Sequence, residues 1–323
     1  MPPMTSTTST TATNGTSSST YSVPSKDQKQ EWAKQQNVLK GNLVVVDDHP
    51  DWSLTLKGDS THRLESIEGL KYVGGVDLSF IVGNNEDAIA SLVVLSYPNF
   101  KVVYENHAKV KLTLPYIAGY LAFREVEPLL DLISTLRSAR PDLEPQVILV
   151  DGCGILHPRG FGLASHLGLL SNIPTIGCSK NYLVIGGDGP LLESNPTLLK
   201  KKFKKFVADH PETHGLMPLQ GTVTGKTYGA ALAAATGNAA EGAQNPIFVS
   251  IGHKVSLETA VAMVRACSRF RVPEPIRQAD LKSRNEIKKW CKQQEKDAAL
   301  TPAAAVVATS ATTASTTATP VAN

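Results

Sequence analysis

The sequence lacks the features of a membrane protein or a secreted protein. None of its apolar runs is long enough to span a bilayer. The N-terminus has neither an apolar core nor an arginine, so neither a signal peptide nor a transit peptide is predicted. Four cysteines without paired spacing favour free thiols in a reducing compartment: Cys153, Cys178, Cys267 and Cys291. We therefore expect a protein of the cytoplasm, the nucleus (nucleolus included) or both.

Charge is absent from both ends of the chain. Pro2–Tyr21 is nearly all Ser, Thr and small residues, and Ala298–Asn323 is rich in Ala and Thr. Such segments bury too little apolar surface to offset the entropy of ordering, so we predict disordered tails at 1–24 and 298–323. Residues 25–297 would suit one large domain or two small ones, and we interpret them as one domain. The net charge of +3 is too small to indicate a nucleic-acid partner by itself.

Two short apolar runs in the middle of the sequence are followed by charged residues. Val147–Val150 and Thr175–Gly177 both have the composition of buried strands. Asp151 follows the first run and Lys180 lies just past the second, with a predicted helix, Leu163–Leu170, between them. In open α/β sheets, ligands bind at the edge where such strands end. We therefore predict a functional site there, and the alternative is a surface turn with a solvated acid.

Glycines and polar side chains crowd the turn that follows this acid. Gly152 and Gly154 permit a sharp turn and the close approach of another molecule. His157 and Arg159 add polar groups beside the turn. This crowding favours the functional site over the solvated turn.

A predicted meander of three strands precedes these motifs. Val73–Phe80, Ala88–Leu95 and Lys101–Lys111 have strand composition and short connections, which is typical of antiparallel neighbours. Asp77 interrupts the apolar pattern of the first strand. A lone acid inside a core strand is costly unless it is paired or bound to a cation. Asp77 therefore either has such a partner or lies in solvent on an edge strand.

A tight loop and a helix follow the meander. Pro115 and Gly119 bracket a loop that carries an aromatic residue, Tyr116. The apolar pattern predicts a helix from there to about Leu136. Glu125 lies in its first turns, where an acid favours the helix dipole even if it has no other role.

The N-terminal part of the predicted domain contains a helix and a polar cluster. Ser25 and Gln28 have the pattern of a capping box before a polar helix that runs to about Leu39. Leu43–Val46 is predicted to be a short strand, and a run of metal-ligand residue types follows it: Asp47, Asp48, His49 and Asp51. Contiguous side chains on an extended chain face opposite ways, so we interpret the run as a solvated loop rather than a metal site.

The C-terminal third is predicted to contain a further strand pair. Gly221–Ala235 and Ile247–Ile251 have strand composition. His253 lies where the second strand gives way to a helix, a position that presents a functional side chain easily but more often holds a structural histidine. Arg269–Arg277 is predicted to be extended because of its prolines.

Two basic segments raise the question of phosphate contacts. Lys200–Phe206 is Lys-rich with interleaved aromatics, and Lys282–Lys296 is predicted to be a basic helix. A solvated helix face is the simpler interpretation of the first segment. For the second, both interpretations stay open.

Asp77, Glu125 and Asp151 are three acids that lie on, or directly after, separate elements of the predicted core. A meander followed by alternating helices and strands is the order of a ribonuclease H-like α/β fold, in which helices flank a mixed sheet. Carboxylate oxygens suit Mg²⁺ or Mn²⁺. Such a cluster supports two-metal hydrolysis of a phosphodiester, with the metals about 4 Å apart.

The same stretches resemble the endonuclease V family of deoxyinosine- and inosine-directed endonucleases. The matching motifs are Val73–Phe80, Pro115–Glu125, Val147–Gly168, Gly177–Lys180 and Val249–Ala262. Cys267–Asp280 resembles the eukaryotic branch in particular. The sequence departs from the bacterial pattern at Ala118, where that pattern has a second proline.

The resemblance implies roles for the residues of these motifs. The metal ligands would be Asp77, Glu125 and Asp151, holding Mg²⁺ or, in its place, Mn²⁺. Lys180 would contact the scissile phosphate or the attacking water, and His253 would assist near the second metal. Tyr116, in a loop with Pro115 and Ile117, would be a wedge that fills the gap left by an extruded base. Backbone groups at Gly119, Leu121, Gly152 and Leu163 would line a hypoxanthine pocket, with His157, Arg159 and Gly162 as further nucleic-acid contacts.

The resemblance also implies the reaction. We expect a monomeric, metal-dependent endonuclease that cuts the second phosphodiester bond 3′ to inosine and leaves 3′-hydroxyl and 5′-phosphate ends. Inosine-containing RNA, single-stranded or structured, is the expected preferred substrate, and deoxyinosine DNA a further one, as in DNA repair. The alternatives are another ribonuclease H-like nuclease without inosine specificity and a non-catalytic inosine-RNA binding protein.

Overall fold

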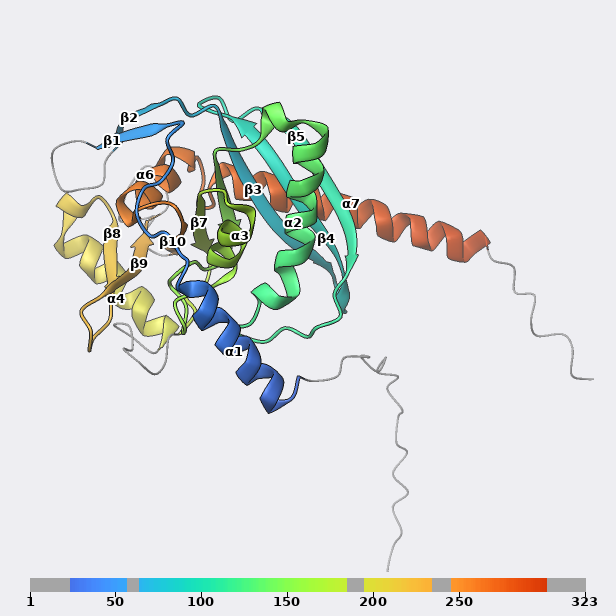
Figure 1. Cartoon of the computed structure of the whole chain (residues 1–323), viewed down its shortest axis with the longest axis horizontal. Coiled ribbons are helices and arrows are strands. Elements are labelled where there is room, and N and C mark those ends of the chain that lie inside the picture. The colour runs from blue at the N-terminus through green and yellow to red at the C-terminus, as the bar shows by residue number, and fades with distance from the viewer. Residues whose placement is uncertain (1–23, 57–63, 185–194, 234–244, 301–323) are drawn as a thin grey trace, which may run out of the picture.

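One eight-stranded mixed sheet organises the residues that the computed structural model describes, which are 24–56, 64–184, 195–233 and 245–300. Its strand order is β5-β4-β3-β6-β7-β10-β9-β8 (Figure 1). In chain order the strands are β3 (Tyr72–Ile81), β4 (Asn84–Ser96), β5 (Val102–Lys111), β6 (Val147–Asp151), β7 (Thr175–Ser179), β8 (Leu216–Gln220), β9 (Thr227–Leu232) and β10 (Ile247–His253). A separate two-stranded sheet pairs β1 (Ser53–Leu56) with β2 (Leu64–Glu68).

The predicted meander is formed by β3, β4 and β5, which pair antiparallel in chain order. On its other side, β3 pairs in parallel with β6. Because β3 has a neighbour on both sides, Asp77 is not on an edge strand, and it is buried. The alternative of a solvated acid on an edge strand is therefore wrong.

The parallel strands β3, β6 and β7 form the centre of the sheet. Val76 pairs with Val150, so the next residues on these two strands, Asp77 and Asp151, lie at the same level. Asp151 in turn pairs with Cys178, near the end of β7. The sheet therefore brings two predicted site residues together at one edge, with Lys180 just past the neighbouring strand.

Helices cover both faces of the sheet (Figure 1). On one face, α2 (Ala122–Ala139) and α3 (Leu163–Ser171) pack their apolar sides around buried Leu129, Ile133 and Leu167. On the other face, α6 (Leu257–Cys267) packs against β9 and β10, and the first half of α7 (Glu274–Leu300) packs against β3, β4 and β6. This arrangement confirms the predicted ribonuclease H-like fold, a mixed α/β sheet with a meander flanked by helices.

Gly75 allows α7 to lie directly on β3. A Cβ at this position would be 2.1 Å from the carbonyl oxygen of Pro275, which is too close for any other residue. Farther along the same helix, Ser283 Oγ lies 2.7 Å from Ser79 Oγ on the strand. The first turns of α7 therefore run along β3 past Asp77, and the second half extends beyond β5 (Figure 1).

The predicted N-terminal helix is α1 (Lys26–Lys40). The Ser25 side chain accepts a hydrogen bond from the Gln28 backbone N–H at 3.1 Å, which is the expected N-cap. The Lys-rich run lies on α4 (Pro196–Asp209), where Phe203 is fully buried and Lys201, Lys204 and Lys205 are exposed. The run thus has the geometry of a solvated helix face.

Three local predictions are wrong. Leu43–Val46 is not a strand, because His253 Nδ1 accepts the Val44 N–H that a strand partner would need. The predicted strand Gly221–Ala235 contains a turn at 221–226, and β9 begins only after that turn. Strand β8 was not predicted, because its amino-acid pattern gave no clear signal. The segment Arg269–Arg277 becomes helical at Glu274, since Pro275 falls in the first turn of α7, where proline is tolerated.

The predicted tails lie largely outside the described residues, which exclude 1–23 and 301–323. Helix α7 runs to Leu300, so it enters the segment 298–323 that was predicted to be disordered. Within the ranges described, no helix combines the length and the apolar character needed to cross a membrane.

Candidate active site

Three acids from separate elements lie near the edge where β6 and β7 end. Asp77 and Asp151 are side by side on β3 and β6, and Glu125 comes from the first turn of α2. Burial, with the negative charges of Asp151 and Asp280, raises the pKa of Asp77 to about 6. Burial, with the charges of Asp77 and Asp151, raises the pKa of Glu125 to about 8 although Arg124 opposes the shift. Both carboxyl groups therefore favour the protonated form more than a solvated acid does.

A fourth acid, Asp280, joins the three that the sequence pointed to. Its charge raises the pKa of Asp77, and it lies on the part of α7 that crosses β3. One helical turn on, Ser283 donates a hydrogen bond to Asp77 Oδ2 at 3.2 Å, as does Ser79 at the same distance. Asp280 was missed because it lies far from the other acids in sequence. The available signal was its position at the end of the stretch that resembles the eukaryotic branch.

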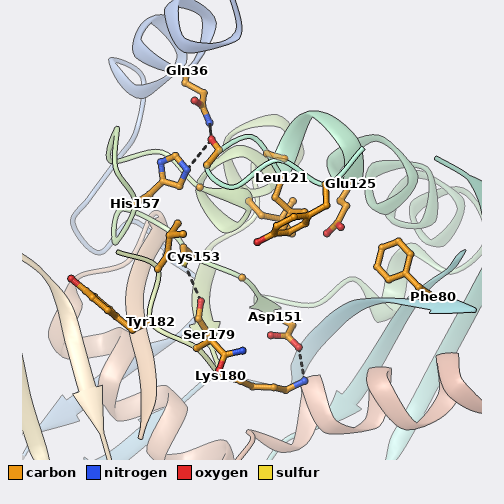
Figure 2. Close-up of a pocket in the computed structure, with 18 residues that line it drawn as sticks. Gln36, Phe80, Leu121, Glu125, Asp151, Cys153, His157, Ser179, Lys180 and Tyr182 are labelled. Atoms are coloured by element: carbon orange, nitrogen blue, oxygen red, sulfur yellow. Dashed lines mark hydrogen bonds and ion pairs between the residues drawn. The ribbon is translucent and has the colours of Figure 1, made fainter. Parts of the chain in front are cut away.

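Lys180 is the cation that pairs with Asp151, while Arg284 pairs with Asp280 at 2.8 Å and Arg124 lies near Glu125. Its Nζ lies 2.7 Å from Asp151 Oδ2 (Figure 2). Burial by itself would lower the pKa of Lys180, but the carboxylates of Asp151, Asp280 and Asp77 raise it. Lys180 therefore stays protonated, and it neutralises only part of the negative charge around it.

The chemistry of this donor set fits a hard divalent cation. Four carboxylates could supply oxygen ligands, and burial together with neighbouring negative charges raises the pKa values of Asp77 and Glu125, which a bound cation would oppose. In the described part of the chain, no three His, Cys, Asp or Glu side chains converge closely enough to enclose a metal ion as they stand.

A pocket of about 580 Å³ extends from the acids to two loops (Figure 2). Glu125, Asp151 and Lys180 line its acidic end. The predicted contacts that line the rest are Tyr116, Gly119, Leu121, Gly152, His157, Gly162 and Leu163. The sequence did not point to several other lining residues, which are Gln36, Phe80, Cys153, Ser179, Asn181, Tyr182 and Leu183. The structure therefore joins two of the acids, Glu125 and Asp151, and most of the predicted base contacts in a single pocket, which Asp77 and Asp280 do not line.

His157 is held neutral in one tautomer. Its Nε2 lies 3.1 Å from the Gly119 carbonyl oxygen, which can only accept, so Nε2 carries the hydrogen. Nδ1 accepts the Arg159 backbone N–H at 3.2 Å. Burial and the nearby Arg159 charge lower the pKa of His157 to about 4. Arg159 itself bonds to the Gly119 carbonyl and lies over the Tyr120 ring at 4.1 Å.

Tyr116 projects from the loop between β5 and α2. Its side chain is 66% exposed, which is unusual for a large aromatic residue beside a pocket. Pro115 and Ile117 on either side of it are partly buried. Tyr116 therefore lines the pocket with an exposed ring, and its role as a wedge stays a prediction.

The structure does not bring His253 to the acids. It pairs with Thr175 at the start of β7, whereas Asp151 and Lys180 lie at the other end of that strand. Its ring is buried and accepts the Val44 N–H at 3.3 Å, so its observed contacts are structural. The polar run after Val46 is also structural, because the Asp47 carboxylate accepts bonds from Ser256 N–H and the Thr259 hydroxyl at the start of α6.

Comparison with known proteins places the chain in one family. Residues 55–281 match the family model described as Endonuclease V. Endonuclease V of Mus musculus is 43% identical over 266 residues, covering 82% of this chain and 71% of the relative. The Homo sapiens protein is 42% identical over 266 residues, with 82% and 86% covered. A similar solved structure is that of Ciona intestinalis Endonuclease V in complex with a 24mer DNA containing an inosine followed by a ribo-adenosine. Its sequence is 40% identical, the TM-score is 0.68, and the match covers 82% of this chain and 99% of that one. The chain belongs to the endonuclease V family and is an endonuclease.

Proposed function

We propose that this protein is a metal-dependent, inosine-directed endonuclease. It hydrolyses the second phosphodiester bond 3′ to inosine and leaves 3′-hydroxyl and 5′-phosphate ends. The observation that carries the proposal is the pocket in which Glu125, Asp151 and Lys180 share one space with the predicted base contacts. A base held at one end would place the following phosphates near the acids at the other.

The acids would hold the metal in this proposal. Asp77, Glu125 and Asp151 are the ligands expected from the sequence, and Asp280 is added by its position on α7. A bound Mg²⁺ or Mn²⁺ would supply charge for the scissile phosphate and lower the pKa of a water molecule. Lys180, protonated beside Asp151, would orient the phosphate or the attacking water. The Ser79 and Ser283 hydroxyls would fix the rotamer of Asp77.

Base recognition would occur between two backbone walls. Hypoxanthine differs from adenine in its carbonyl acceptor at position 6 and its ring N–H donor. Backbone groups near Gly119, Gly152 and Leu163 can read that edge without bulky side chains. His157 would not compete as a charged group, because it stays neutral above its pKa of about 4. Tyr116 would fill the space that the extruded base leaves.

We further propose that the preferred substrate is inosine in single-stranded RNA. Extruding a base from a duplex costs a few kcal/mol that a single strand largely avoids. Ala118, in place of the proline of the bacterial pattern, leaves the Tyr116 loop less stiff. The Ciona relative was crystallised on a strand in which a ribo-adenosine follows the inosine, which supports a role for ribose beside the scissile bond. We propose that the protein acts as a monomer in the cytoplasm or nucleus.

The test is cleavage of matched oligonucleotides, with and without Mg²⁺ or Mn²⁺. The set contains single-stranded RNA and DNA, each with inosine or adenosine at one position. The proposal predicts metal-dependent cleavage of both inosine strands, with RNA cut faster. A DNA strand with one ribonucleotide beside the scissile bond should recover much of the RNA rate. Equal cleavage of adenosine strands would indicate a nuclease without inosine specificity, and binding without cleavage would indicate a non-catalytic protein.

A further inference from the structure

Helix α1 is attached to the rest of the protein by two buried side chains. Trp32 and Gln36 are the residues of the helix that are buried, and their i, i+4 spacing places them on one face. The Trp32 ring stacks on Phe123 with centroids 5.2 Å apart, and it lies 5.7 Å from the Tyr120 ring. The helix lies outside residues 55–281 that match the family model. It nevertheless packs on the segment that leads from the Tyr116 loop into α2.

Gln36 uses its amide for three hydrogen bonds. The side chain is 1% exposed, and Nε2 donates to the Gly119 carbonyl at 3.2 Å and to the Phe161 carbonyl at 3.1 Å. Its Oε1 accepts a hydrogen bond from Arg159 Nε. A flipped amide would direct oxygen at two carbonyl oxygens, so these partners determine its orientation. Loss of the amide would leave buried polar groups with fewer partners, which is costly.

The two carbonyls that Gln36 joins belong to two different loops, each of which contributes a wall of the pocket. Gly119 ends the loop that carries Tyr116, and Phe161 precedes the lining residues Gly162 and Leu163. Gly119 has a φ of +81°, a conformation that favours glycine. Figure 2 shows Gln36 reaching from α1 to the Gly119 carbonyl beside His157. The amide therefore ties one wall to the other from a third element, beside the direct bonds from His157 and Arg159 to the Gly119 carbonyl.

We propose that Gln36 is a positioning residue that sets the separation of the two pocket walls and thereby the selectivity for the extruded base. The inference rests on the proposed function, because it takes the occupant of the pocket to be hypoxanthine. A planar base makes backbone hydrogen bonds only if both walls stand at the correct distance, within about 0.5 Å. The acids are held by β3, β6, α2 and α7, so loosening the walls should weaken base binding more than the chemical step.

The test compares Gln36→Ala and the near-isosteric Gln36→Met with a matched control, Gln35→Ala. Gln35 lies on the same helix and is exposed, so it reports any general effect of altering α1. KM and kcat are measured on single-stranded RNA with one inosine. Dissociation constants for inosine and adenosine strands are measured with Ca²⁺ in place of Mg²⁺ to prevent turnover. Thermal unfolding is followed for every variant.

Both Gln36 variants should raise KM about tenfold and lower the inosine-to-adenosine binding ratio by a similar factor, as expected when a buried hydrogen-bond network is removed. The kcat should stay within about threefold of wild type, and Gln35→Ala should change none of these three quantities.

A Gln36→Met variant that folds and keeps the wild-type KM and binding ratio would overturn the inference. A lower melting temperature with unchanged KM and binding ratio would do the same, because the role would then be merely structural. A wild-type protein that fails to distinguish inosine from adenosine would instead contradict the proposed function.

Discussion

At the scale of single residues, two buried acids with raised pKa values distinguish the site. Asp77 is 8% exposed and has two carboxylates as its charged neighbours, with Lys180 as a counter-charge that pairs directly with Asp151. Glu125 is equally buried. Buried acids in this arrangement resist ionisation, because burial and like charges both disfavour the charged form. A bound divalent cation would remove that penalty, so the acids should matter for metal binding and cleavage, and without metal their ionisation should lower stability.

Replacing either acid of the parallel strands should abolish cleavage. Asp77→Ala and Asp151→Ala each remove a proposed metal ligand, while the fold and inosine binding should stay largely intact. Single-turnover cleavage at saturating Mn²⁺ is the measurement, and circular dichroism checks the fold. Asp131→Ala, an exposed acid on α2, is the matched control and should cleave like wild type. Turnover above about a tenth of wild type in either variant would show that the metal assignment is wrong.

The pH dependence of stability should also report on Asp77. Its pKa is raised from 3.8 to about 6 in the folded protein, so folding favours the protonated form. The contribution of this group to stability is complete below pH 3.8 and is lost as the pH rises to about 6. In EDTA, the melting temperature of Asp77→Asn relative to wild type should therefore rise between those pH values and level off above them. A difference that stays constant across this range would contradict the assigned shift.

At the scale of elements, the site depends on strand register and on the course of α7. The parallel pairing of β3 with β6 aligns two acids, and the close approach at Gly75 lays α7 across β3 so that Asp280 joins them. The second half of α7 continues past β5, where Trp290 lies under Lys109 at 4.9 Å. Lys288 and Lys292, one turn apart, are exposed on this extension. The helix therefore links the acids to a basic surface.

If that surface contacts phosphates, the double substitution Lys288→Ala/Lys292→Ala should weaken binding to all sequences alike. The slope of log affinity against log salt should shrink by about one unit for each phosphate that the variant no longer neutralises. Lys71→Ala/Lys101→Ala is the matched control, since these exposed lysines lie where β3 and β5 begin, away from the acids. Fluorescence anisotropy over a salt series gives both slopes. An unchanged slope would identify the surface as a solvated helix face.

The loop between β5 and α2 should control the use of duplex substrates. Proline at Ala118 would stiffen the loop behind Tyr116 and offset more of the cost of opening a duplex. Ala118→Pro should therefore raise the rate on duplex deoxyinosine DNA more than on single-stranded inosine RNA. Parallel time courses on the two substrates measure the ratio of rates. An equal effect on both would mean that loop stiffness does not limit base extrusion.

At the scale of the whole molecule, the sequence predicted those structural features that depend on hydrophobic periodicity and on the order of the motifs. Strand composition indicated the meander, and the charged residues after β6 and β7 indicated the sheet edge of the site. Contacts over long sequence separation were not predictable in the same way. Asp280 reaches the acids only because Gly75 admits α7, and Gln36 reaches the pocket from a helix that looks merely polar in sequence. At His253 the error is the opposite one. The sequence pointed to it as a site residue, but the end of β10 that carries it lies at the start of β7, away from the acids.

The central claim is that one pocket couples base recognition to cleavage at a fixed spacing. The most direct measurement maps the cut in single-stranded RNAs that are identical except that one inosine is moved along the strand in single-nucleotide steps. With Mg²⁺ or Mn²⁺ present, the cut should follow the inosine and remain at the second phosphodiester bond on its 3′ side, with 5′-phosphate ends. A cut that stays at one sequence position while the inosine moves, or that occurs equally in the adenosine strand, would contradict this claim.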